Sequence, residues 1–160
     1  MLIRIVAVGQ RTPGWVDAAV ADYLKRLPPE LKVELCTVKT EARGNDARKP
    51  AAGQALMARE AQRIRTQLPA RCKLVVLDER GEDMTTAALA ERLGSWQREA
   101  APVAIVIGGP DGIDAQLRAD AHQSIRLSSL TLPHALVRVL LAEQLYRAWS
   151  VNAKHPYHRE

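Results

Sequence analysis

The chain has 160 residues and a formal net charge of +5, and 47% of its residues are hydrophobic. This length is typical of one domain, and the hydrophobic share can fill a core, which excludes a disordered chain. Phe is absent and only three Trp and three Tyr occur, so the core must be mainly aliphatic. We therefore expect one globular domain over residues 1–160.

Short apolar runs and helical periodicity alternate along the chain. The runs predict five strands, at residues 2–8, 33–38, 74–77, 103–107 and 124–127. The periodic segments predict helices at residues 16–27, 51–68, 85–100, 114–121 and 135–150. Because each strand is followed by a helix that can cross back, we expect an α/β fold with a mostly parallel sheet of five to six strands and helices on both faces.

Most of the positive charge lies early in the chain. Residues 1–100 hold 17 Lys and Arg against 13 Asp and Glu, whereas residues 101–160 hold 6 against 5. Such a surplus favours a polyanion such as RNA, although many soluble enzymes are mildly basic. The longest polar connection, KTEARGNDARKP at residues 39–50, fits a solvated surface loop and an RNA-phosphate contact equally well.

The apolar segments are too short for export or membrane insertion. The opening MLIRIVAVGQ contains Arg4 and is too short a run for a secretory signal, and the uncharged stretch from Pro102 to Pro110 cannot cross a bilayer. Cys36 and Cys72 lie in apolar runs without Cys-x-x-Cys spacing, which favours buried thiols over a disulfide or a metal pair. We expect a cytoplasmic protein.

Three loops follow strands at the sheet edge where open parallel sheets bind ligands. They read LDERGEDM from Leu77, IGGPDG from Ile107 and LSSLTLPH from Leu127. Glycines in the second loop let backbone approach a ligand closely. A tight turn before a helix capped by Asp114 is an equally good interpretation of that loop alone.

Motifs that bind phosphate are missing from the sequence. The first strand ends in GQRTPG rather than G-x-G-x-x-G, and neither a P-loop nor a G-x-S-x-G elbow occurs. The uncharged loop at residues 127–134 instead offers backbone N–H and C=O groups to a flat polar heterocycle, with Leu127, Leu130 and Leu132 as apolar walls. This composition suits an adenosyl cofactor without phosphates.

Apolar residues of the helix at 135–150 extend well beyond one stripe, so this helix needs cover on more than one side. A homodimer interface supplies that cover more economically than the interior of a single chain. Arg138 and Glu143 interrupt the apolar surface, and each needs a partner or an exit to solvent.

The chain ends in VNAKHPYHRE, where a frayed terminus is the default expectation. Two of the four His, a Tyr and two cations nevertheless gather here, and such side chains hold unstacked RNA bases. His155 and His158 lack the further ligands that a metal site needs, so we expect no metal. We interpret His122 and His134 as structural or helix-terminal.

Four stretches occur together: LVVLDERG, VAIVIGGPDG, LSSLTLPHALVRVLLAEQLYRAWSV and NAKHPYHRE. This combination closely resembles the RlmH family, the SPOUT-class methyltransferases that modify N3 of a pseudouridine in 23S ribosomal RNA. The opening IVAVGQRTPGWVDAAVADYLKRLP is similar to that family's N-terminus, so the resemblance covers nearly the whole chain. Residues 41–72 match only loosely.

The resemblance implies a SPOUT fold, an α/β knot in which the C-terminal segment threads through a loop to form a trefoil knot. It also implies a homodimer packed through the helix from His134, in which the tail of one subunit approaches the pocket of the other. S-adenosylmethionine is expected to bind in that pocket, with these residues lining it: Leu77, Gly108, Gly109, Leu127, Ser128, Ser129, Leu130, Thr131 and Leu132.

The same resemblance places Tyr157, His158 and Arg159 beside the target base as the catalytic residues. N3 of a pseudouridine carries a proton, and loss of that proton leaves negative charge on the ring. A base such as His158 and a cation such as Arg159 suit those two tasks.

We therefore expect an S-adenosylmethionine-dependent methyltransferase that acts as a homodimer on ribosomal RNA within the ribosome, without a membrane or a metal. Scattered cations such as Arg43, Arg48 and Lys154 would contact phosphates. The main alternative is a non-catalytic ribosome- or RNA-binding protein with a knotted α/β shell. A phosphate-using transferase is a further hypothesis, which the missing phosphate motifs disfavour.

Overall fold

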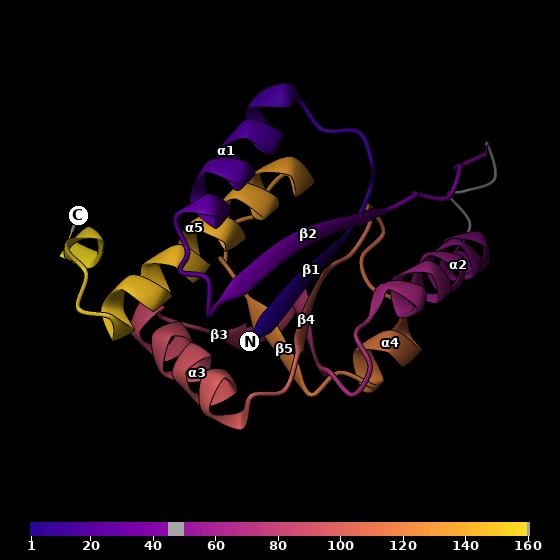
Figure 1. Ribbon diagram of the computed structural model, residues 1–160. Helices are drawn as coiled ribbons and strands as arrows, with labels where there is room; N and C mark the ends of the chain where they lie inside the picture. The colour runs from indigo at the N-terminus through magenta and orange to yellow at the C-terminus, as the bar shows by residue number, and fades with distance from the viewer. Residues whose placement is uncertain (45–49, 160) are drawn as a thin grey trace.

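The computed structural model describes residues 1–44 and 50–159, in which strands and helices alternate as the sequence predicts (Figure 1). Arg48 and Lys49 lie outside the described residues. The elements are β1 (Leu2–Val8), α1 (Gly14–Lys25), β2 (Lys32–Val38), α2 (Pro50–Gln67), β3 (Lys73–Asp83), α3 (Thr86–Glu99), β4 (Val103–Ile107), α4 (Ala115–Ala119), β5 (Gln123–Arg126), α5 (His134–Asn152) and the short 3₁₀ helix η1 (Pro156–Arg159).

The five strands form one sheet in the order β2-β1-β4-β3-β5, and neighbouring strands are parallel throughout. The predicted parallel α/β sheet is therefore confirmed, with five strands. In β4 all five residues of VAIVI are buried, as expected for a central strand covered on both faces.

Helices cover both faces of the sheet (Figure 1). On one face, α3 and α5 pack on a core that includes Ile3, Ile5 and Trp96. On the other face, α2 and α4 pack on a second core built around Val6 and Val106. The helix α1 packs against α5 through a third, smaller core, formed by Val16, Val20 and Ala142.

Strand β3 differs from its prediction because it does not end at Leu77. It continues to Asp83, and its register with β5 jumps on the way, so that Ile125 of β5 is paired with both Leu77 and Glu82. The residues between the two pairings pass close to β5: a Cβ added to Gly81 would lie 2.6 Å from the carbonyl carbon of Ile125. Glycine is required at this contact because there is no room for a side chain.

The register aligns the ends of three neighbouring strands. Leu77 is paired with Ile107 of β4 and with Ile125 of β5. Because the strands are parallel, the residues that follow lie side by side at the carboxyl edge of the sheet: the irregular part of β3 after Leu77, the turn after β4 and the end of β5.

Both cysteines are free, as predicted, but they are half-buried rather than buried. Burial still raises the pKa of the Cys72 thiol. Within residues 1–44 and 50–159, no helix combines the length and the apolar character needed to cross a bilayer.

Replacing Gly81 with Ala tests the close contact between β3 and β5. The added methyl group must push two backbones apart, and we expect the free energy of unfolding to fall by roughly 1–3 kcal/mol, the usual cost of overpacking. Gly53→Ala in α2 is the control, because no atom lies within 4 Å of its added Cβ. That variant should be neutral or more stable by up to about 1 kcal/mol, since Ala favours helix. Equal melting temperatures for the two variants would contradict the close contact between Gly81 and the β5 backbone.

Candidate functional site

A cavity of about 640 Å³ opens at the carboxyl edge of the sheet. Its walls are the segments that follow Leu77, Ile107 and Ile125, together with the first turn of α5. All nine residues predicted to bind the cofactor line this single cavity: Leu77, Gly108, Gly109, Leu127, Ser128, Ser129, Leu130, Thr131 and Leu132. The structure therefore brings together residues that lie up to 55 positions apart in the sequence, from Leu77 to Leu132.

The segment from Leu127 to Leu132 forms the uncharged wall. It is neither helix nor strand, and one local bond stabilises it, because the Leu130 amide donates to Ser128 Oγ at 2.9 Å. Leu127 packs against the main core, whereas the Leu130 side chain is 75% exposed. An irregular, uncharged segment of this kind presents both backbone groups and apolar side chains to a ligand.

The glycine turn after β4 forms the opposite wall. The Gly112 amide donates to the Gly109 carbonyl at 3.0 Å, and Gly112 has φ +95°, a conformation that favours glycine. Asp114 accepts hydrogen bonds from the amides of Gln116 and Leu117, both at 3.0 Å, and so caps α4. Both interpretations of this stretch hold: it is a turn before a capped helix, and it lines the cavity.

Charged residues of the cavity wall were not predicted from the sequence. Asp78, whose side chain is 5% exposed, forms an ion pair with Arg118 of α4, with Nε 2.7 Å from Oδ2. Arg126 donates to Asp83 through Nε at 2.7 Å, and this hydrogen bond holds the pKa of Asp83 below its usual range. Asp78 follows an apolar run directly, which is a usable signal, but nothing local in the sequence marks Arg118 as its partner.

His134 begins α5, as expected for a helix-terminal residue, and it also lines the cavity. Its Nδ1 is buried without a hydrogen bond among the described residues. His122 is structural, as expected, since its Nδ1 accepts the amide hydrogen of Leu74 at 3.1 Å.

Arg138 fastens α5 to the end of β1. This residue is 3% exposed, and its Nη2 donates to the carbonyls of Val8 at 3.1 Å and Gly9 at 2.6 Å. Burial lowers the pKa of Arg138. Two backbone carbonyls therefore serve as the partners that we expected for the buried Arg138 guanidinium. The second charge in this helix, Glu143, is paired with Arg147, whose Nε donates to Oε1 at 2.8 Å.

The tail does not line the cavity of its own chain. Tyr157, His158 and Arg159 belong to η1, beyond the far end of α5 (Figure 1). Because α5 has 19 residues, its length of about 28 Å separates the tail from the cavity at its first turn. In this structure none of the three contributes to the cavity wall.

The tail is nevertheless anchored rather than frayed. The Tyr157 hydroxyl donates to Glu143 Oε1 at 3.1 Å, its ring centroid lies 4.7 Å from that of Tyr146, and the Arg147 guanidinium covers it at 4.7 Å. Burial, followed by hydrogen bonds with Tyr23 and Glu143, raises the pKa of Tyr157 well above its usual range. The phenol is therefore held in its neutral form.

Of the cations expected to contact phosphates, Lys154 is exposed, whereas Arg43 is engaged with carboxylates. The Arg43 guanidinium donates hydrogen bonds to Asp111, so it takes part in a contact within the protein. Among residues 1–44 and 50–159, no three His, Cys, Asp or Glu side chains gather in a way that could hold a metal ion.

Comparison with solved structures shows the same fold. A probable methylase family protein from Haemophilus influenzae Rd KW20 superposes with a TM-score of 0.56 at 18% identity, over 96% of this chain and 69% of that one. A putative methylase family protein from Neisseria gonorrhoeae gives a TM-score of 0.51 at 14% identity, over 90% and 81%.

Comparison of sequences is more specific. Residues 1–158 match the model of the predicted SPOUT methyltransferases. Proteins named Ribosomal RNA large subunit methyltransferase H from Delftia acidovorans and Acidovorax sp. are 59% and 60% identical to this chain, with 100% of both chains covered. The chain therefore belongs to the SPOUT methyltransferase family, and within it to the group of the ribosomal RNA large subunit methyltransferase H proteins.

Proposed function

We propose that the chain is an S-adenosylmethionine-dependent methyltransferase that modifies N3 of a pseudouridine in large-subunit ribosomal RNA and works as a homodimer. The observation that carries this proposal is the convergence of three loops on one cavity at the carboxyl edge of the sheet. The names of the relatives support the RNA substrate. The choice of pseudouridine N3 rests on the resemblance in the C-terminal third of the chain.

The cavity suits an adenosine-bearing methyl donor. Its volume of about 640 Å³ falls within the usual range for small-molecule sites. Leu127 and Leu132 would flank the adenine, while backbone groups of the same segment would hydrogen-bond its edge. The turn at Gly108 and Gly109 would contribute backbone groups to the site, and the two glycines let this turn pack closely on Ile113 and Glu60 of the protein.

A second copy of the chain would complete the site. The first half of α5 carries Leu136, Val139 and Leu140, which are only half-buried in the single chain. Packing of a second copy over α5 would cover these side chains, and closed twofold symmetry would supply two equal sites. The tail of each subunit would then lie at the cavity of the partner subunit rather than at the cavity of its own chain.

The chemistry divides between the ligand and the protein. The cofactor supplies a methyl group already activated by its sulfonium. The protein has to hold the base in line, exclude water and remove the proton from the base nitrogen. In this proposal His158 accepts that proton, and Arg159 stabilises the negative charge that develops on the ring. Tyr157, whose phenol stays neutral, would hold the tail in position.

We expect the C-terminal trefoil knot of the family in this chain. The pairing of β3 with β5 is irregular in this region: β3 shifts its register between Leu77 and Glu82, both of which are paired with Ile125, and Gly81 packs on the β5 backbone. The alternative, a non-catalytic RNA-binding protein, would use the same shell but would gain nothing from a cavity fitted to a cofactor.

A measurement of cofactor binding distinguishes the methyltransferase from a non-catalytic RNA-binding protein. At a concentration of S-adenosylmethionine 100 times its Kd, we expect the melting temperature to rise by roughly 5–11 °C, because the ligand binds only the folded chain. ATP and NAD at the same concentrations should produce no shift. A shift with ATP instead, or with none of the three, would contradict the proposed function.

Mixing two inactive variants tests the shared site. Thr131→Trp would fill the cavity, and His158→Ala would remove the proposed base from the tail. Each heterodimer would then hold one intact site, so an equal mixture should recover about a quarter of the wild-type methyl transfer. Recovery is expected only after subunit exchange. If the exchanged mixture stays as inactive as its components, the tail does not act across the dimer.

The neutral phenol of Tyr157 can be measured directly. Because its pKa is raised in the folded chain, Tyr157 should contribute no tyrosinate absorbance at about pH 11, one unit above the usual tyrosine pKa of about 10. Wild type and Tyr157→Phe should therefore give equal tyrosinate signals while circular dichroism shows both to be folded. A signal smaller by one tyrosine in the variant would show that the phenol ionises normally.

A further inference from the structure

The glycine turn of the cavity is backed by a buried carboxylate. A Cβ added to Gly109 would lie 2.6 Å from Oε2 of Glu60, so the turn packs directly against this carboxylate. Glu60 projects from α2 and is 2% exposed. The position of the turn therefore depends on where the Glu60 carboxylate is held.

Glu60 has few partners for a buried charge. Its Oε1 accepts the amide hydrogen of Glu41 at 3.1 Å, and its Oε2 accepts no hydrogen bond among the described residues. A buried carboxylate without a compensating cation is strongly destabilising. Arg43 supplies that cation, with Nη2 3.6 Å from Oε1 of Glu60.

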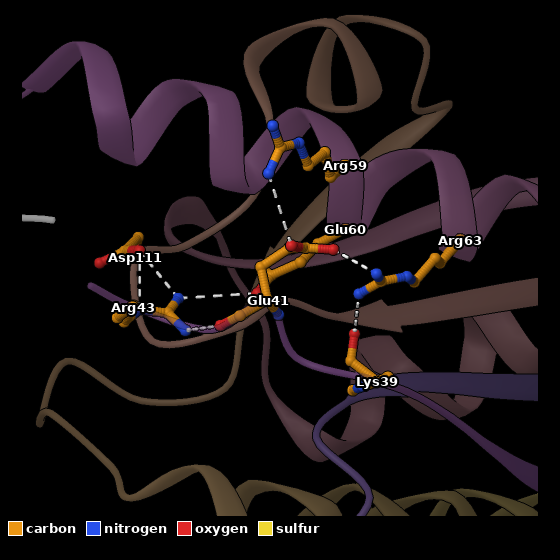
Figure 2. A network of polar contacts seen from close by, with 7 residues as sticks. All are labelled: Lys39, Glu41, Arg43, Arg59, Glu60, Arg63 and Asp111. Atoms are coloured by element: carbon orange, nitrogen blue, oxygen red, sulfur yellow. Dashed lines mark hydrogen bonds and ion pairs between the residues drawn. The ribbon is translucent and has the colours of Figure 1, made fainter.

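Arg43 also reaches the tip of the glycine turn (Figure 2). Its Nε and Nη2 donate to Oδ2 of Asp111 at 3.0 Å and 2.8 Å, and its Nη1 donates to the Glu41 carbonyl at 3.2 Å. Asp111 itself lines the cavity. One guanidinium thus joins the buried carboxylate behind the turn to the acidic side chain at its tip.

The segment that carries Arg43 is itself fastened to α2 (Figure 2). The Glu41 carboxylate forms ion pairs with Arg63 and, at 3.8 Å, with Arg59. Arg63 Nη1 also donates to the Lys39 carbonyl at 2.8 Å. Because α2 packs on the sheet, this network connects the glycine turn to a fixed part of the fold.

We infer that Arg43 is a positioning residue for the cofactor site: held by Glu60, it fixes the turn at residues 108–112 through Asp111. This inference rests on the proposed function, because it assumes that the cavity holds S-adenosylmethionine. It assigns Arg43 to cofactor binding rather than to RNA phosphates. Loss of Arg43 should therefore raise the KM for the cofactor while kcat at saturating cofactor stays near that of the wild type.

A double-mutant cycle on Arg43 and Asp111 tests this coupling. We expect Arg43→Ala and Asp111→Ala each to weaken binding of S-adenosylmethionine by about three- to tenfold, as measured by calorimetry, which lies at the lower end of the effects seen for coupled neighbours. The double variant should bind no more weakly than either single one. Arg43→Lys, which keeps the charge, should recover part of the loss.

The ion pair of Arg65 and Asp120 is the matched control. Arg65 also projects from α2, the two side chains are 41% and 39% exposed, and neither residue lines the cavity. Arg65→Ala should leave the affinity for the cofactor and its KM unchanged.

The outcomes separate the inference from the proposed function. If the wild type does not bind S-adenosylmethionine, the proposed function is wrong, and the inference falls with it. If the wild type binds and folded Arg43→Ala binds equally well, only the inference is wrong. Should Arg43→Ala fail to fold, Asp111→Asn decides, because it keeps the volume and removes the charge. Wild-type affinity in that folded variant would overturn the inference.

Discussion

The site depends on the parallel register at Leu77. This residue is paired with Ile107 on one neighbouring strand and with Ile125 on another, so the residues that follow these three positions start at one level of the sheet. Because the strands are parallel, these segments share one edge and line a common space. The cavity is therefore a consequence of strand pairing, and the side chains of the loops only decide what fits into it.

Much of this arrangement follows from the sequence. The ends of β1 and β4 agree with prediction, because each apolar run stops at a glycine, Gly9 or Gly108. The nine cavity residues were predictable because they follow apolar runs directly or belong to stretches that resemble a known family. The continuation of β3 to Asp83 was not, since the segment after Leu77 is charged, lacks alternation, and is ordered by pairing with β5.

Contacts between distant segments mark the limit of sequence reasoning. Asp78 and Arg118 meet because β3 and α4 are brought together by the fold, and Arg43 meets Asp111 across 68 positions. Composition alone gave Arg43 two equally good interpretations. The tail shows the same limit at a larger scale: α5 has 19 residues and separates the tail from the cavity of its own chain, and no local pattern in the sequence gives that separation.

A crystal structure of the chain with S-adenosylhomocysteine would show where the ligand binds and how two copies pair. We expect the adenosine between the segment at residues 127–132 and the glycine turn at 108–112, with η1 of a second copy at the mouth of the same cavity. Adenosine bound elsewhere on the chain, or η1 directed away from every cavity in the assembly, would contradict this expectation.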